Sequence, residues 1–151
     1  MFFKESGKIQ EVPTPLTVKQ LRDWTQKMPF GELVGIRPVR AHKDGLTIAC
    51  TVRPELLNTM NVLHGGVTAT MADAAAGMAI VRLTGGLKRI TTVEMKLNYF
   101  KPVAEGTLTA RAYVIRMGSQ IAVARVDLHD HKKSLVGTAL VTYMVLGDLT
   151  P

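Results

Sequence analysis

The stretch of residues 58–80, NTMNVLHGGVTATMADAAAGMAI, constrains the fold of this chain more than any other part of it. Between the glycine pair Gly65-Gly66 and Arg82, Asp73 is the only charged residue. A helix with so few charges is buried on most of its surface. The sequence therefore predicts one central helix over about residues 65–83, ended by the second glycine pair that follows it.

The start of this helix is unusual, because His64 is followed by Gly65 and Gly66. Glycine has no Cβ, so the backbone N–H groups stand uncovered at the positive end of the helix dipole. An electron-rich oxygen atom can dock at such a helix start. We therefore expect the loop before the helix and its first turn to take part in binding.

Alternating apolar and polar residues on both sides of the helix predict strands. Asp44-Gly45 is the turn chemistry of a hairpin between the first two strands. Residues 54–61 are expected to form a short turn or a single helical turn. The predicted strands are residues 30–42, 46–52, 88–101, 106–117, 120–129 and 134–146. One long helix with five or six strands predicts a single α+β domain over residues 1–151, in which an antiparallel curved sheet wraps around the central helix.

The N-terminal part is predicted to be simpler. Residues 1–15 are expected to form a loose tail. Residues 17–28 have apolar side chains at helical spacing and Thr17 as a cap, which predicts a short helix. Trp24, the single tryptophan, is expected to anchor this helix to the core.

Asp73 has two interpretations. Its face of the helix, at about 100° per residue, is shared by Gly66, Ala69, Thr70, Ala76, Gly77 and Ile80. In the structural interpretation the small residues allow close packing, and a backbone amide or the Thr70 hydroxyl satisfies the carboxylate. In the functional interpretation the carboxylate has no partner on its own helix and acts from a crevice as a base or nucleophile.

The same stretch resembles the active-site signature of the hotdog-fold acyl-CoA thioesterases, in the branch that includes phenylacetyl-CoA thioesterase-like proteins. The pattern of that family is an Asn, then His-Gly-Gly, then an Asp. Asn58, His64-Gly65-Gly66 and Asp73 stand at the spacing of the family.

The resemblance covers about residues 30–147. Relatives place a Ser or Thr near the carboxylate in the strand after the helix, and Thr92 falls there. Asn61 departs from the pattern, because many relatives have a glycine at that position. The resemblance implies a hotdog fold and hydrolysis of a medium-chain or aromatic acyl-CoA to free acid and CoA. It implies no cofactor, since coenzyme A is part of the substrate.

The resemblance also implies a role for each signature residue. The Gly65 N–H polarises the thioester carbonyl and stabilises the developing oxyanion. Asn58 hydrogen-bonds the attacking water or the carbonyl, and Thr92 orients the carboxylate or the water. Asp73 activates that water as a general base or attacks directly as a nucleophile. The sequence leaves these two roles of Asp73 open.

The distance along the helix indicates a composite site. Gly65 and Asp73 are eight residues apart, roughly 12 Å at 1.5 Å per residue, so they cannot both reach one carbonyl from the same helix. If both serve one reaction, the Gly65 amide comes from one subunit and Asp73 from a second, antiparallel copy. The family works in this way, so the resemblance implies a homodimer, assembled further into a dimer of dimers.

Two sets of residues are predicted to bind the substrate. The acyl pocket is expected to be lined partly by the helix and its lead-in, for example by Val62, Leu63, Met71 and Ile80. His64 and Gly66 are also expected to bind the substrate. His64 fits a structural role in the loop, through a ring hydrogen bond, better than a role as base or metal ligand. The basic residues near strand ends that are expected to contact the CoA phosphates are Arg116, Lys132 and Lys133. No metal site is predicted, because His129 and His131 lack a further Cys/His cluster.

The charge balance, 19 Lys and Arg against 12 Asp and Glu or a net +7, suits an anionic partner. The basic residues are scattered and aromatic residues make up only 5%, so no nucleic-acid-binding face is indicated, whereas the phosphates of CoA fit the charge.

There is no signal-peptide core and no apolar run long enough to cross a bilayer, so we expect a cytoplasmic protein without membrane contact. Cys50, the single cysteine, is predicted to be a buried, reduced thiol.

Three other functions remain open from the sequence. The first is a non-catalytic acyl-CoA-binding hotdog module, against which the joint presence of Asn58, Gly65 and Asp73 argues. The second is a nucleic-acid-binding protein, which only the charge suggests. The third is a dehydratase on the same fold, but that branch usually needs an Asp/His dyad in a different motif.

Overall fold

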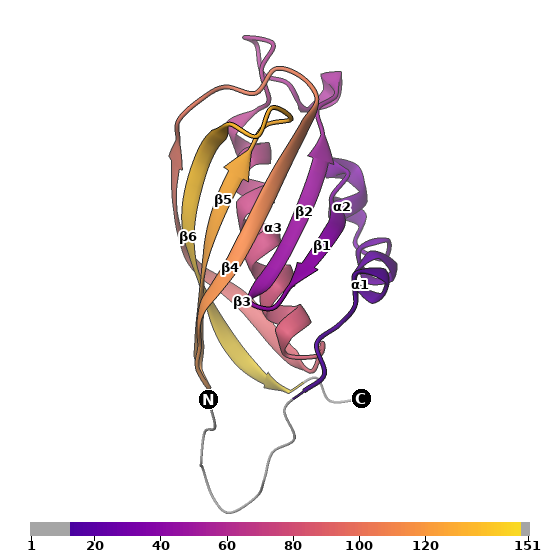
Figure 1. Cartoon of the computed structure of the whole chain (residues 1–151), viewed down its shortest axis with the longest axis vertical. Coiled ribbons are helices and arrows are strands. Elements are labelled where there is room, and N and C mark those ends of the chain that lie inside the picture. The colour runs from indigo at the N-terminus through magenta and orange to yellow at the C-terminus, as the bar shows by residue number, and fades with distance from the viewer. Residues whose placement is uncertain (1–12, 149–151) are drawn as a thin grey trace, which may run out of the picture.

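The computed structural model describes residues 13–148, in which an antiparallel sheet curves around one long helix, α3 (Gly65–Leu83) (Figure 1). The strands are β1 (Arg37–His42), β2 (Gly45–Thr51), β3 (Lys88–Tyr99), β4 (Thr107–Met117), β5 (Ile121–His129) and β6 (Leu135–Asp148). Helices α1 (Val18–Thr25) and α2 (Pro29–Val34) precede the sheet, and the short 3₁₀ helix η1 (Pro54–Leu56) precedes α3. This arrangement confirms the predicted α+β hotdog fold.

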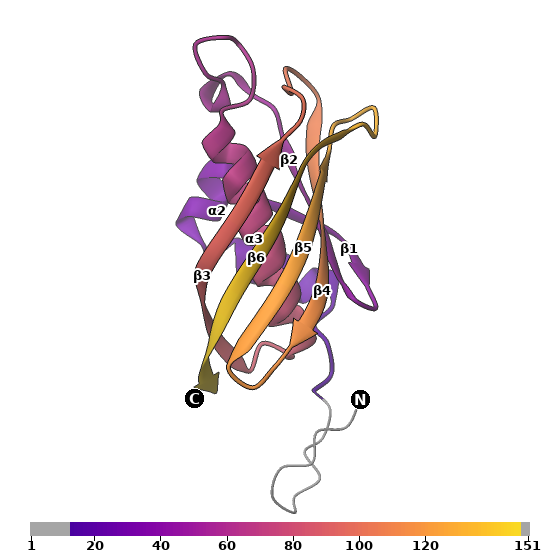
Figure 2. The same cartoon turned by 90° about the vertical axis from the view of Figure 1, so that its left-hand side faces the viewer.

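The strand order is β1-β2-β4-β5-β6-β3, and every neighbouring pair is antiparallel. The chain leaves β2, passes through α3, and enters β3 at the far edge of the sheet, where β3 pairs with β6. Figure 2 shows β3 at this edge, with α3 behind the sheet. The register of β3 shifts between Thr92 and Glu94. No strand pairs with the outer side of β3 within residues 13–148.

Helix α3 has the predicted bounds because both of its ends carry local signals. His64 is the N-cap, and its side chain accepts a hydrogen bond from the main chain. Gly85 and Gly86 follow the helix with φ of 64° and 76°, a left-handed conformation that favours glycine. Between these ends, small side chains let α3 lie close to β2, β4 and β5. The buried residues of α3 are Thr68, Met71, Ala72, Ala75, Ala76, Gly77, Met78, Ala79 and Ile80.

The prediction of a strand over residues 30–42 is wrong in its first part, which forms α2. The apolar residues of this segment, Phe30, Leu33 and Val34, have helical spacing. Pro29 suits the first position of a helix, and Gly35, with φ of 82°, ends it. Only β1 keeps the predicted extended conformation.

Helix α1 lies within the predicted range 17–28, and Thr17 forms a capping box with Gln20. Leu21 is fully buried and anchors α1, whereas Trp24 is 40% exposed. The prediction that Trp24 anchors the helix is therefore wrong. Residues 1–12 of the predicted tail lie outside the described residues, and residues 13–15 belong to no helix or strand.

Cys50 is a buried free thiol, as predicted. Its Sγ lies 3.2 Å from the main-chain oxygen of Val34, and burial raises the pKa of the Cys50 thiol.

The stretches of α-helix within residues 13–148 are all too short or too polar to cross a membrane.

Candidate active site

The carboxylate of Asp73 is bound by hydroxyl groups from two strands. The Thr92 hydroxyl, on β3, donates to Oδ1 of Asp73 at 2.9 Å. The Tyr143 hydroxyl, on β6, lies 2.7 Å from the same Oδ1 and 2.8 Å from the main-chain oxygen of Asp73. Thr70 forms no hydrogen bond with Asp73 in the described part of the chain. The partners of this carboxylate therefore come from the sheet and not from its own helix.

Tyr143 is a residue of this site that the sequence did not predict. Its side chain is only 5% exposed, and burial, together with the charge of Asp73, raises the pKa of Tyr143 well above its usual range. The phenol therefore stays protonated and can donate a hydrogen bond. Tyr143 lies 70 residues after Asp73 in the chain, and no local motif marks it. The available signal was a hydroxyl group at an inward position of an otherwise apolar strand.

The start of α3 leaves one main-chain donor free. The Gly66 N–H donates to Nδ1 of His64 at 2.9 Å, so the N-cap occupies it. The Gly65 N–H has no hydrogen bond within residues 13–148. The Tyr99 hydroxyl donates to the main-chain oxygen of Gly65 at 3.0 Å and holds this residue against β3. Gly65 therefore offers the free N–H at the positive helix end.

Asn58 organises the loop that leads into α3. Its Oδ1 accepts from the N–H of Met60 at 2.9 Å and from the N–H of Val62 at 3.3 Å. Its Nδ2 has no partner in the part of the chain that the structure describes, so this amide group can donate to a substrate. Asn61 has φ of 56°, a left-handed conformation that Asn tolerates better than most residues. Asn61 thus reproduces the backbone conformation that glycine would allow.

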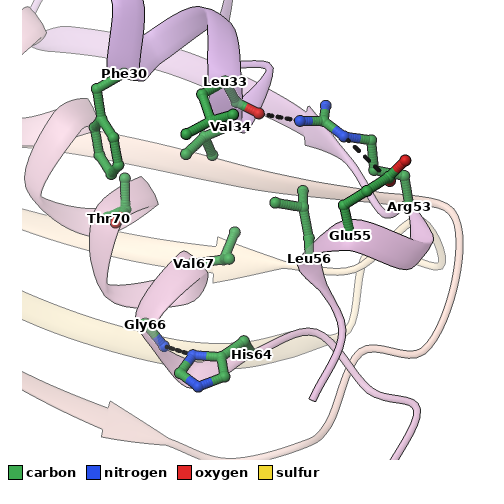
Figure 3. Close-up of a pocket in the computed structure, with 10 residues that line it drawn as sticks. All are labelled: Phe30, Leu33, Val34, Arg53, Glu55, Leu56, His64, Gly66, Val67 and Thr70. Atoms are coloured by element: carbon green, nitrogen blue, oxygen red, sulfur yellow. Dashed lines mark hydrogen bonds and ion pairs between the residues drawn. The ribbon is translucent and has the colours of Figure 1, made fainter.

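A cavity of about 570 Å³ lies between α2, η1 and the first turns of α3 (Figure 3). Its lining residues are Phe30, Leu33, Val34, Arg53, Glu55, Leu56, His64, Gly66, Val67 and Thr70. Figure 3 shows Phe30 and Thr70 at one end and the Arg53–Glu55 ion pair at the other. Arg53 also donates to the main-chain oxygen of Leu33. Apolar side chains thus line the middle of the cavity, and charged groups lie at one end.

The structure separates the four residues that were expected at the acyl pocket from His64 and Gly66, the two other residues expected to bind the substrate. His64 and Gly66 line the cavity. Met71 and Ile80 are fully buried in the core, and Leu63 is almost as well buried. Neither these three nor Val62 lines the cavity. Met71 and Ile80 lie on opposite sides of α3, and both are enclosed in the core.

The three basic residues expected at the CoA phosphates do not lie together. Lys132 and Lys133 belong to the turn between β5 and β6, at the end of the sheet where the chain also enters α3. Arg116 lies near the end of β4, at the opposite end of the sheet. A strand of this length separates the two ends by roughly 30 Å. Arg116 therefore cannot contact the same nucleotide as the two lysines within one subunit.

The fold and the site together define a class, namely hotdog-fold proteins that combine a helix-start amide with a carboxylate on the same helix. The model of the thioesterase superfamily matches residues 60–136. The medium/long-chain acyl-CoA thioesterase YigI of Escherichia coli is 31% identical over 133 residues, 78% of this chain and 86% of that protein. A putative esterase of Saccharolobus solfataricus is 28% identical and covers 86% of each chain. The chain belongs to the thioesterase superfamily, within the hotdog acyl-CoA thioesterase family, and is a thioester hydrolase.

Solved structures are similar in fold over most of the chain. A thioesterase of Haemophilus influenzae superimposes with a TM-score of 0.82 at 23% identity, covering 87% of this chain and 92% of that one. The PaaI protein from the phenylacetic acid degradation operon of E. coli gives a TM-score of 0.76 at 19% identity, covering 89% and 100%. At these identities the likeness supports the hotdog fold.

Proposed function

We propose that this protein hydrolyses the thioester of a medium-chain or aromatic acyl-CoA, and that Asp73 carries the reaction. The observation that supports this proposal is the combination on α3 of a hydroxyl-bound carboxylate with the free N–H of Gly65. The names of two similar proteins agree with the substrate class, since one is a medium/long-chain acyl-CoA thioesterase and the other belongs to a phenylacetic acid operon.

The chemistry can follow either of two routes. In the general-base route, Asp73 takes a proton from water while the water oxygen bonds to the thioester carbon. The Gly65 N–H then stabilises the oxyanion, the C–S bond breaks, and the CoA thiolate leaves and takes up the proton. In the nucleophilic route, Asp73 itself bonds to the carbonyl carbon, the C–S bond breaks and the CoA thiolate leaves, so that an anhydride forms. Water then hydrolyses this anhydride to the free acid and the Asp73 carboxylate, and the thiolate takes up the proton that is released. The free amide of Asn58 donates to the carbonyl or the water in both routes.

The site is complete only with a second copy of the chain. The N–H of Gly65 and the carboxylate of Asp73 are separated by roughly 12 Å along α3. The outer edge of β3 carries unpaired main-chain groups in the described residues, and a long free edge favours pairing with another strand. An antiparallel copy at this edge brings the partner's helix start toward Asp73. We therefore include a homodimer, and its further assembly into a dimer of dimers, in the proposal.

The acyl group is proposed to enter the cavity beside the start of α3. Its volume, about 570 Å³, falls within the range of small-molecule sites. The large side chains Phe30 and Leu33 are 59% and 68% exposed there, and an apolar chain or an aromatic ring would cover them. His64 and Gly66 join the cavity to the amide of Gly65. Lys132 and Lys133, at the same end of the sheet, are proposed to face the CoA phosphates.

The test of the proposal is the release of free thiol from a panel of acyl-CoAs by the parent and by Asp73→Asn. We expect this variant to lose turnover by roughly 100-fold or more, because the amide can neither accept the proton nor attack. Its fold should persist, because the side-chain oxygen of asparagine still accepts from Thr92 and Tyr143. The matched control is Asp127→Asn, since Asp127 also accepts from a threonine hydroxyl, that of Thr138, at 2.9 Å.

Asp127→Asn should hydrolyse the panel like the parent. Full turnover in a well-folded Asp73→Asn protein would refute the role of Asp73. The absence of thiol release from every acyl-CoA by the parent would refute the proposed activity itself.

A further inference from the structure

The carboxylate of Asp73 has one oxygen that is held and one that is free. The hydroxyls of Thr92 and Tyr143 both reach Oδ1, at 2.9 and 2.7 Å. Within residues 13–148 no hydrogen bond reaches Oδ2. In that range, Nε of Arg82 is the only fully buried side-chain polar atom that lacks a hydrogen-bond partner. Since Oδ2 also lacks a partner, it is not fully buried and keeps contact with solvent. The two oxygens are therefore chemically distinct.

Features of α3, β3 and β6 together place the Tyr143 hydroxyl next to the carboxylate of Asp73. On α3, a Cβ at Gly77 would lie 2.7 Å from the phenol oxygen, so the absence of a side chain there admits the hydroxyl. On the sheet, Tyr143 stands opposite Thr92 in the β3–β6 pairing. The register of β3 shifts directly after Thr92, and such a bulge re-aims a side chain. A tyrosine that only filled the core would not need this space next to the helix backbone.

We propose, on the basis of the function proposed above, that Tyr143 is a positioning residue for the hydrolysis. Together with Thr92 it fixes the carboxylate of Asp73 through Oδ1, so that Oδ2 is the atom that takes the proton from water or bonds to the thioester carbon. Hydrogen bonds to a carboxylate favour its charged form, which is the form that both routes use. Gly77 is the residue that makes this contact sterically possible.

The first test is Tyr143→Phe, which keeps the ring and removes the donor. We expect kcat to fall by roughly 10- to 100-fold, because a hydrogen bond to a charged group is lost, and KM to stay within about twofold, because the phenol does not touch the substrate. The matched control is Tyr113→Phe, whose ring packs 4.0 Å from the guanidinium of Arg111 on β4.

The second variant is Gly77→Ala, which keeps the phenol but forces its oxygen away from α3. It should lower kcat and leave KM within about twofold, as is expected for Tyr143→Phe. A folded Tyr143→Phe protein with the parental kcat would overturn the inference. If that variant does not fold, a folded Gly77→Ala protein with parental values would overturn it in the same way.

The two proposals fail in different ways. An inactive Asp73→Asn beside a fully active Tyr143→Phe would remove only the positioning role of Tyr143. Full activity in both variants would remove the proposed function of the site as well.

Discussion

At the scale of single residues, the side chains around α3 divide into those that a ligand can reach and those that the sheet encloses. Phe30 is 59% exposed at the end of the cavity, so an acyl chain that fills the cavity buries part of its ring. Met71 is fully buried against the sheet and only supports the core. Truncating each of them therefore tests where the acyl group binds.

Phe30→Ala is expected to raise KM for a twelve-carbon acyl-CoA by about fivefold or more and to leave KM for acetyl-CoA nearly unchanged. The reason is the lost apolar contact, worth about 25 cal/mol for each Å² of area removed from water. Met71→Ala is expected to lower the free energy of unfolding by about 2–5 kcal/mol without changing the preference among acyl chains. Steady-state kinetics with a chain-length series and thermal melts measure both effects.

The control for Phe30→Ala is Leu135→Ala, an exposed residue of β6 outside the cavity. It should keep the parental chain-length preference. If Met71→Ala changed that preference and Phe30→Ala did not, the acyl group would bind in the interior of the fold, as the sequence-based assignment of Met71 expected.

The candidate site residues that could be predicted from the sequence lie in a continuous motif or, like Thr92, at a position that the family resemblance supplies. Asn58, Gly65 and Asp73 fall within one short stretch, and the helical repeat alone gives the distance between the last two. Tyr143 could not be predicted, because its contact with Asp73 depends on the order and register of β3 and β6. In the sequence it is only one of three tyrosines, all of which fall in predicted strands.

At the scale of elements, α3 could be predicted from local sequence signals, whereas α2 could not. Both ends of α3 are marked by glycines and by a cap, so its bounds were predictable. Helix α2 is only six residues long, and the apolar residues at its start and end also fit the alternation of a strand. Pro29 and Gly35 favour the helix. Pro29 suits the first position of a helix, and Gly35 takes the left-handed conformation that ends it.

The free edge of β3 gives a prediction about assembly. Val93, in the middle of β3, is 54% exposed. In an antiparallel dimer about a central two-fold axis, Val93 would face its own copy. Val93→Arg would place like charges next to each other there. We expect a folded monomer with little activity, measured by light scattering and thiol release.

The matched control for this substitution is Val39→Arg. Val39 is also a half-exposed valine on an edge strand, but it lies on β1, at the opposite edge of the sheet. It should leave both the dimer and the activity intact. An active dimer of Val93→Arg would show that the two copies do not meet through this edge.

At the scale of the whole molecule, the position of the site along α3 decides how many chains the reaction needs. One subunit carries the start of α3 and the Asn58 loop at one end of the sheet, and it carries Asp73 in the middle of the helix. The net charge of +7 does not prevent two copies from meeting, because exposed charges far apart are screened by salt. In the proposed dimer, each site therefore combines the helix start of one subunit with Asp73 of the other.

This sharing of each site between two subunits can be tested by complementation between two inactive variants. Asn58→Ala and Asp73→Ala homodimers should each be nearly inactive. After the two chains are unfolded and refolded together, half of the randomly formed dimers are heterodimers. One site of each heterodimer combines an intact Asn58 from one chain with an intact Asp73 from the other. Activity should therefore recover to roughly a quarter of the parental value for a two-fold dimer.

Mass spectrometry under native conditions must confirm the heterodimers, because the recovery depends on their fraction. A mixture of Asn58→Ala with itself, treated in the same way, controls for activity gained by refolding alone. If heterodimers form and activity stays at the level of the single variants, Asn58 and Asp73 act within one subunit. The proposal of a site shared by two subunits, which rests on the roughly 12 Å between Gly65 and Asp73 along α3, would then be refuted.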